Sequence, residues 1–360
     1  MTTNFDQSNI QIPQWTHAYG GAESKGKIKS KPADFIVREQ LPFYPEGEGE
    51  HVFLQIKKCG ENTEYVARLL ARFAGVRQRD IGFAGLKDRH AITTQWFSVW
   101  LPGKEDPDWQ QMEVETIEIL QVQRHARKLK RGVLSGNSFE ILIREWQGNK
   151  AKLEQQLQQL KQHGFPNYFG EQRFGRQGQN VNKALALFDG EKVKREQRSI
   201  YLSAARSFLF NQLLAKRITL GSWNQGISGD IFIFDKSNSY FKTEQLDDSV
   251  LARIKQSEIH PTGMMFGKGE SEVTLEALAL EQTIINENQA LAKGLIQLDL
   301  SAARRALRVM VNDLQWEFKD DSQLLLKFSL PAGSYATSLV RELLDTTNGN
   351  CSPPPLKKGD

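Results

Sequence analysis

A short polar loop near the end of the first quarter of the chain carries the side chains best suited to chemistry. Residues 86–90 read Leu-Lys-Asp-Arg-His, so Asp88 has two permanent cations and an imidazole as sequence neighbours. Nearby positive charge favours the ionised form of an acid. The pattern therefore predicts an ionised carboxylate, which suits a nucleophile. A solvated hairpin loop whose charges have no function is the commoner meaning of such a pattern.

Regular elements are expected on both sides of this loop. Residues 81–83 resemble the end of a short strand, Gly85 breaks it, and residues 93–99 are rich in β-branched and aromatic side chains. Upstream, apolar residues at helical spacing predict a helix that is capped by Asn62 and ends before Gly75. The loop is therefore expected to be held by a strand, a helix and a second strand.

A second segment whose side chains could bind a substrate follows a dense basic run. Residues 124–131 contain five arginines and lysines and lead directly into Ser-Gly-Asn-Ser-Phe at residues 135–139. The cations are expected at the mouth of any site that Asn137 and Phe139 line, although a solvated face explains such a run equally well. The ring of Phe139 can stack on an extruded base, and the Asn137 amide can pair with a base edge or a ribose hydroxyl.

The composition is that of an ordinary globular protein. The chain has 360 residues, of which 39% are hydrophobic and 25% are charged. This length predicts two domains, because a single hydrophobic core stops growing at about 250 to 300 residues. The net charge is only +4, so a nucleic-acid partner would be bound by local basic patches rather than by a globally basic surface.

Several classes of site and location are not expected. Cys59 and Cys351 are far apart and no Cys or His cluster occurs, which argues against a metal site and fits a reducing cytoplasm. Glycine-rich phosphate or dinucleotide motifs and the common hydrolase motifs are also missing from the sequence, so no cofactor is expected. The sequence has neither a signal-peptide pattern at its start nor an apolar run of membrane-spanning length, so we expect no membrane insertion.

Seven motifs, taken in order, resemble the TruD family of tRNA pseudouridine synthases. Together they span nearly the whole chain, which makes the resemblance specific. The motifs are KSKPADFIVRE from Lys29, GEGEH from Gly47, AGLKDRHAITTQW from Ala84, SGNSF from Ser135, PNYFGEQRFG from Pro166, LSAARSFLFN from Leu202 and PAGSYATSLVREL from Pro331.

The resemblance implies roles for individual residues. Asp88 is the implied nucleophile, and Lys29 is implied to lie near it. Phe35 and Phe139 match aromatic residues that hold the substrate, and Asn137 is expected to bind it with them. Without the resemblance, Lys29 would be interpreted as an exposed strand lysine and Phe35 as a core aromatic.

Two further expectations concern the substrate. Tyr335 stands where the family has a phenylalanine that contributes to substrate binding, so the ring is retained and a hydroxyl is added. Cations near the loop and in the basic run are expected to contact RNA phosphates. These expected phosphate contacts are Lys87, Arg127, Lys128 and Lys130.

The expected fold class is α+β. The resemblance implies a pseudouridine synthase catalytic domain with a mixed, mainly antiparallel sheet flanked by helices, interrupted by a large inserted α/β domain. The expected parts are an irregular segment at 1–26, a discontinuous catalytic domain at 27–162 plus 312–347, the inserted domain at 163–311 and a disordered tail at 348–360. Within the insertion, residues 274–308 are expected to be helical.

The function that the resemblance implies is isomerisation of uridine to pseudouridine in tRNA, at uridine 13 of the D arm. The implied enzyme is a cytoplasmic monomer that needs no metal or cofactor. Attack by Asp88 on C1′ of the ribose or on C6 of the uracil stays open. A second hypothesis is an RNA-binding or tRNA-folding-assistance protein of the same fold. A glycoside-type hydrolase is disfavoured, because no convincing second acid lies near Asp88 in the sequence.

Overall fold

The computed structural model describes residues 10–112, 114–237 and 239–348. The chain forms two compact units, and each unit is built from separated stretches of sequence. The sheet unit comprises Glu23–Lys150, Val311–Gly333 and the chain from Leu344 onward, and the helical unit comprises the chain up to Ala22, Ala151–Met310 and Ser334–Leu343. None of the described helices combines the length and apolar character that a membrane crossing requires.

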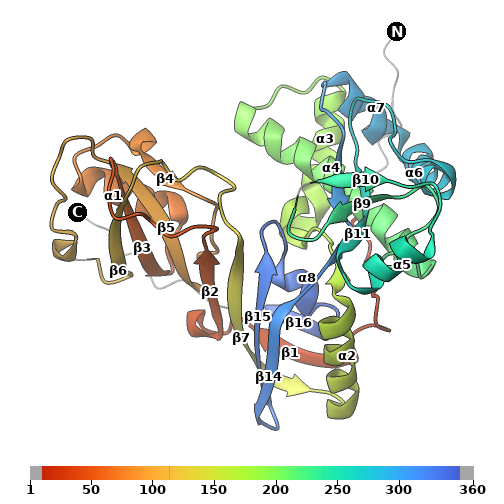
Figure 1. Cartoon of the computed structure of the whole chain (residues 1–360), viewed down its shortest axis with the longest axis horizontal. Coiled ribbons are helices and arrows are strands. Elements are labelled where there is room, and N and C mark those ends of the chain that lie inside the picture. The colour runs from red at the N-terminus through yellow and green to blue at the C-terminus, as the bar shows by residue number, and fades with distance from the viewer. Residues whose placement is uncertain (1–9, 113, 238, 349–360) are drawn as a thin grey trace. The chain divides into compact units, whose positions relative to one another are not determined.

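A large mixed sheet dominates the sheet unit (Figure 1). Its main path runs β14-β15-β7-β2-β5-β3-β6, with β1, β4 and β16 joined at the side. Among the described strands, β1 with β16 and β2 with β5 pair in parallel, and the other pairs are antiparallel. The strands are β1 (Ser24–Ile28), β2 (Phe35–Gln40), β3 (His51–Cys59), β4 (Ile81–Phe83), β5 (Ile92–Trp100), β6 (Ile117–His125), β7 (Gly136–Gln147), β14 (Asn312–Asp320), β15 (Gln323–Pro331) and β16 (Leu344–Asn348).

Alternating side chains explain how this sheet is packed. Successive residues of a strand point to opposite faces, and on β3 the side chains of Val52, Leu54 and Ile56 pack with α1 (Thr63–Phe73), whereas Phe53 packs into a separate cluster with Trp96. All four β3 side chains are fully buried. The strand is therefore covered on both faces, which fixes its register and that of the neighbouring β5.

The helical unit packs helices around a small sheet of order β10-β9-β11-β12 (Figure 1). Its helices are α2 (Lys150–His163, from Ala151 onward), α3 (Gln179–Phe188), α4 (Arg195–Thr219), α5 (Asp248–Lys255), α6 (Leu275–Glu287), α7 (Gln289–Gln297) and α8 (Ala336–Val340). Its strands are β8 (Phe165–Pro166), β9 (Ile231–Phe234), β10 (Tyr240–Lys242), β11 (Ile259–Met265), β12 (Ala303–Ala306) and β13 (Arg308–Val309).

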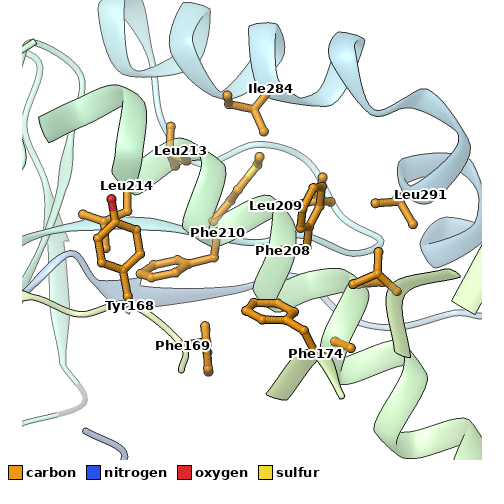
Figure 2. Packing of buried hydrophobic residues seen from close by; sticks show 14 of the residues in the cluster. Tyr168, Phe169, Phe174, Phe208, Leu209, Phe210, Leu213, Leu214, Ile284 and Leu291 are labelled. Carbon is orange, nitrogen blue, oxygen red and sulfur yellow. The ribbon is translucent and has the colours of Figure 1, made fainter. Parts of the chain in front are cut away.

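Helix α4 is the centre of the core of the helical unit. Figure 2 shows Phe208, Leu209 and Phe210 of this helix among side chains from α6, α7 and the segment after β8. Leu209 and Phe210 are completely buried. Because the helix is covered on most sides along its second half, its backbone is a rigid support for side chains that project from its first turns.

The structure differs from the sequence-based expectation at the end of the predicted helical stretch. Residues 275–297 form α6 and α7 as expected, but the predicted helix over 300–308 is wrong, because this segment forms β12 and β13. Ala303–Ala306 pairs with β11, and Arg304 donates hydrogen bonds to the side chain and carbonyl of Thr262. These tertiary bonds override the helix propensity of an Ala- and Arg-rich segment.

The fold class is confirmed as α+β with a mixed, mainly antiparallel sheet. The two compact units divide the chain differently from the expected domains, because residues 10–22, α2 from Ala151 and the segment Ser334–Leu343 all belong to the helical unit. The expectation of an irregular segment over 1–26 is wrong at its end, because β1 already begins at Ser24, where it pairs with β7 and β16. The expected domain boundaries stay a prediction. The expected disordered tail lies, apart from Asn348, outside the described residues.

Candidate active site

The loop that carries Asp88 connects β4 to β5 and is fastened by buried polar side chains. Gln95 of β5 donates to the carbonyl of Gly85 at 2.6 Å, and the Thr63 hydroxyl at the start of α1 donates to Gln95 at 3.0 Å. The same hydroxyl accepts the backbone N–H of Lys87 at 3.0 Å. Thr63 and Gln95 are buried. The loop is therefore attached to both the helix and the strand next to it.

Asp88 receives one hydrogen bond on each carboxylate oxygen. Lys29 Nζ lies 2.5 Å from Oδ2, and the backbone N–H of His90 donates to Oδ1 at 2.9 Å. The Asp88 side chain keeps 26% of its surface exposed, whereas that of Lys29 keeps 11%. The carboxylate is thus oriented by two donors while part of it stays open to a ligand.

The environment of Asp88 holds it ionised. Burial raises the pKa of the carboxyl group, but the hydrogen bond from Lys29, the His90 N–H and the charge of Lys29 together outweigh it, so the pKa lies below its ordinary value. A carboxylate that is partly desolvated yet charged is a better nucleophile than one fully hydrated in water.

Lys29 occupies an unusual backbone conformation directly after β1. Its φ is +55°, a left-handed value that is rare for a residue with a side chain. Such strain persists only where the surrounding structure imposes it, and it is commonest at functional sites. The ammonium group lies 4.5 Å from the centre of the Phe35 ring, so Lys29 contacts both the carboxylate and the first predicted aromatic residue.

Three phenylalanines from neighbouring strands form an aromatic cluster beside Lys29. Phe35 of β2 meets Phe139 of β7 edge to face at 6.3 Å, and Phe139 stacks on Phe328 of β15 at 5.3 Å. Phe35 is 5% exposed and Phe139 7%. One face of Phe139 is therefore covered by Phe328, which leaves at most one face for a base. The structure brings Asp88, Lys29, Phe35 and Phe139 together.

Asn137 lies near the start of β7, in register with Glu39 of β2 and Leu330 of β15. Its Oδ1 atom is buried and has no hydrogen-bond partner within the described part of the chain. A buried acceptor without a donor is uncommon in folded proteins. A uracil N–H or a ribose hydroxyl would supply the missing donor.

The expected phosphate contact at Lys87 needs correction. Its ammonium lies 2.6 Å from Glu39 Oε2, and the two side chains keep only 8% and 0% of their surface exposed. The other oxygen of Glu39 accepts the backbone N–H of Trp96 at 3.1 Å. Because the Lys87 charge is neutralised inside the protein, this ammonium does not fit the role of an RNA phosphate ligand.

Two charged residues of the site were missed by sequence reasoning. Glu39 shares the buried face of β2 with Phe35 and Val37, and this alternation is the signal that could have found it. Lys58 at the end of β3 is 1% exposed and donates to the carbonyl of Glu61 at 2.8 Å. Burial lowers its pKa to about 8, against the opposing attraction of the Asp88 charge. No sequence signal distinguished Lys58 from an exposed strand lysine.

The basic run is divided between paired and exposed cations. Arg127 and Lys130 are exposed, and no ion pair is found for either within the described residues. Lys128 donates to the carbonyl of Arg79 at 2.5 Å, and Arg131 lies 3.9 Å over the ring of Phe83. Arg127 and Lys130 are therefore the cations of the expected set that are most available to a phosphate.

Tyr335 belongs to the helical unit, whereas the other predicted site residues belong to the sheet unit. Its hydroxyl accepts a hydrogen bond from Arg173 at 2.7 Å, and its ring lies 6.1 Å from that of Phe169. The hydroxyl that distinguishes Tyr335 from the family phenylalanine is therefore bonded within the protein. No group of three or more metal-ligating side chains occurs among the residues that the structure describes.

Comparison with known proteins agrees with the resemblance in the sequence. A sequence model of the family described as tRNA pseudouridine synthase D (TruD) matches residues 14–191 and 177–343. A protein named tRNA pseudouridine synthase D from Methylococcus capsulatus is 49% identical over 330 residues, covering 91% of this chain and 93% of that protein. A namesake from Hydrogenovibrio crunogenus is 43% identical over 338 residues, covering 93% of this chain and 97% of that protein.

A solved structure has the same fold. The crystal structure titled putative tRNA pseudouridine synthase D from Methanosarcina mazei superposes with a TM-score of 0.76 at 21% identity. The match covers 93% of this chain and 96% of that chain. At this identity the likeness concerns the fold, and the family rests on the sequence matches.

Proposed function

Since the chain belongs to the tRNA pseudouridine synthase D family, we propose that it converts a uridine of tRNA to pseudouridine with the Asp88 carboxylate as nucleophile. The observation that carries the proposal is the pairing of Asp88 with Lys29 at 2.5 Å beside a partly exposed carboxylate. Enzymes of this class are isomerases. The assignment of the nucleophile rests on the geometry of this chain and on its match to the family motif.

The reaction balances within the substrate itself. The bond between N1 of uracil and C1′ of ribose breaks, and a bond between C5 and C1′ forms. The hydrogen on C5 leaves as a proton, and N1 gains one. Substrate and product therefore have the same formula, so the reaction consumes no oxidant, reductant or nucleotide triphosphate. The protein must supply a nucleophile, hold the base while it turns, and accept and return one proton.

Asp88 is proposed to act as the nucleophile through its open surface. Attack at C1′ stabilises the sugar after the base departs, and attack at C6 of uracil weakens the glycosidic bond; both require the ionised carboxylate. Lys29 is proposed as a positioning residue, because it keeps Asp88 charged and oriented. A rigid nucleophile loop reduces the entropy cost of reaching the transition state, because the carboxylate is already oriented.

The substrate base is proposed to lie against the aromatic cluster. A uridine within a folded tRNA has to leave its stack before an enzyme can act on it, and aromatic side chains then replace the lost stacking. Phe35 lies beside the ammonium of Lys29, which pairs with Asp88, and Phe139 contacts Phe35. Asn137 is proposed to accept a hydrogen bond from the uracil N3–H or the ribose 2′-hydroxyl through its unpartnered oxygen.

The proposed target is uridine 13 of the D arm, as the family resemblance implies. The test is a single-turnover reaction on a tRNA transcript, with pseudouridine mapped at single-nucleotide resolution by carbodiimide labelling and primer extension. We expect one modified position, and no modification of a matched transcript in which uridine 13 is cytidine. Modification at another uridine would overturn the target while leaving the reaction class intact, and absence of any pseudouridine would overturn the proposed function.

A further inference from the structure

We propose that a basic groove on helix α4 of the helical unit binds backbone phosphates of the tRNA substrate. The proposal rests on the proposed function, because it names where part of that substrate is held. The groove has a volume of about 410 Å³ and is lined on one side by α4 and on the other by Met265 and Leu300. Its lining residues from α4 include Arg195, Arg198 and Arg206.

The spacing of these residues places them on one face of the helix. Steps of three or four residues align side chains along an α-helix, and the lining positions 195, 198, 199, 202, 203 and 206 follow such steps. The lining contains three arginines and two serines and no carboxylate. A guanidinium group binds phosphate through two parallel hydrogen bonds, and serine hydroxyls add further donors.

The deep end of the groove is anchored and the outer end is free. Arg206 donates to the carbonyls of Met265 at 2.7 Å and Ser301 at 3.1 Å, and its buried Nε has no acceptor within the described structure. Arg195 and Arg198 are exposed, and no ion pair involves either in the described part of the chain. The two outer arginines are thus available to an anionic ligand, while Arg206 shapes the floor.

A chain of hydrogen bonds links the groove to Tyr335. Arg173 donates one nitrogen to the hydroxyl of Ser203 at 3.0 Å and the other to the hydroxyl of Tyr335 at 2.7 Å. Ser203 lines the groove, and Tyr335 is the residue that the family resemblance assigns to substrate binding. An RNA strand that reaches Tyr335 therefore has phosphates close to Ser203 and the arginines beyond it.

The shape and lining of the groove favour the tRNA backbone over a small free anion. A groove that is open, extended along a helix face and lined by several arginines fits a chain of phosphates, since each guanidinium can take a separate one. The arginines are proposed to contact only backbone phosphates and no bases. They are therefore expected to strengthen tRNA binding without selecting a nucleotide sequence. Their signature is a salt-dependent contribution to affinity.

The test compares three double variants with the wild type. Arg195→Gln with Arg198→Gln removes both outer charges, and Arg195→Lys with Arg198→Lys keeps them. Lys216→Gln with Lys255→Gln is the matched control, because these exposed lysines of α4 and α5 lie outside the groove. The tRNA Kd is measured between low and moderate salt, with the single-turnover rate at saturating tRNA and the Tm of each variant.

We expect the arginine-to-glutamine variant to bind tRNA roughly 5- to 30-fold more weakly. Its log–log salt slope should be flatter by roughly 0.7 to 0.9 for each phosphate that the protein no longer neutralises. The arginine-to-lysine variant should keep most of the slope. The rate at saturating tRNA should stay within about twofold of wild type, since uniform binding energy does not lower the barrier.

An arginine-to-glutamine variant that matches the Lys216 and Lys255 control in Kd and slope would overturn the groove as a phosphate site. Loss of binding in this variant, together with a wild type that makes no pseudouridine, would retain the groove and overturn the proposed function. The two failures are therefore distinguishable.

Discussion

At the residue scale, the Asp88 carboxylate is kept both charged and accessible to a ligand. Burial alone would favour the neutral acid, and full exposure would leave the carboxylate hydrated. Asp88 lies between these limits because Lys29 and the His90 N–H offset the cost of burial. The left-handed backbone at Lys29 is a conformation that the surrounding structure has to hold in place.

Replacement of Lys29 by methionine should raise the pKa of Asp88. The main influences that lower the pKa are then removed, while burial, which raises it, remains. In the wild type the Asp88 carboxylate stays ionised at pH values below the ordinary pKa of an aspartic acid, so activity should persist at mildly acidic pH. In Lys29→Met the acidic limb of the single-turnover pH profile should move to higher pH, with little change in tRNA affinity.

Lys27→Met is the matched control for this change. Lys27 lies on β1, two residues before Lys29, its side chain is 44% exposed, and it pairs with Glu145 at the surface. Its replacement should leave the pH profile unchanged. An acidic limb at the same pH in Lys29→Met and wild type would show that Lys29 does not control the ionisation of Asp88. The same linkage applies to stability: the contribution of Asp88 is present above its ordinary pKa and is lost as the pH falls through the lowered value.

At the element scale, the nucleophile loop is held by contacts between strands that are distant in sequence. Glu39 of β2 joins Lys87 of the loop and the Trp96 N–H of β5. Both side chains of the ion pair are almost fully buried. Lys87 directly precedes Asp88, so any shift of this pair moves the nucleophile. We infer that the pair is a positioning device for the loop.

Breaking the Glu39–Lys87 pair should damage both stability and the chemical step. Lys87→Met or Glu39→Gln leaves one buried charge uncompensated, which costs about 3–5 kcal/mol of unfolding free energy. Because the loop then relaxes, the single-turnover rate at saturating tRNA should fall at least about tenfold, with a much smaller change in Kd. The double variant should be less damaged than the sum of the two single changes.

The exposed pair of Arg38 and Glu140, on the neighbouring positions of β2 and β7, provides the control. Its side chains are 48% and 29% exposed, so the matching Arg38→Met and Glu140→Gln changes should cost no more than about 1 kcal/mol. Equal effects at the two pairs, or a rate unaffected by Lys87→Met in folded protein, would contradict a positioning role.

Local patterns predicted the elements around the site but not its charge pairs. The strands before and after the loop, helix α1 and the loop itself follow from periodicity and from breakers such as Gly85. The partner of Lys87 depends on which strands are neighbours in the sheet, and no local pattern gives the order β2-β5-β3. From local sequence alone, Lys87 is therefore indistinguishable from a phosphate contact, although it is paired with Glu39. The proximity of Lys29 to Asp88 was likewise implied by the family and not by the spacing of the residues.

At the scale of the whole molecule, the family match spans both compact units. The predicted site residues divide between them, since Asp88 and its neighbours belong to the sheet unit and Tyr335 to the helical unit. The net charge of +4 gives little general attraction for RNA. Affinity is therefore expected to come from local cations, with Arg127 and Lys130 in the sheet unit and the arginine groove in the helical unit.

The most direct test of the account is pseudouridine formation by Asp88→Asn. Asparagine keeps the shape of the side chain and an acceptor for Lys29 or His90 but cannot act as the nucleophile. Asp80→Asn, which makes the same change at a carboxylate that accepts the backbone N–H of Arg77 at 3.2 Å, serves as the control. Single-turnover reactions on a tRNA transcript, read by mapping of pseudouridine, should show a loss on the order of a thousandfold or more for Asp88→Asn. The tRNA Kd and the Tm should stay close to wild type, and Asp80→Asn should remain active. Substantial pseudouridine formation by folded Asp88→Asn would contradict the central claim.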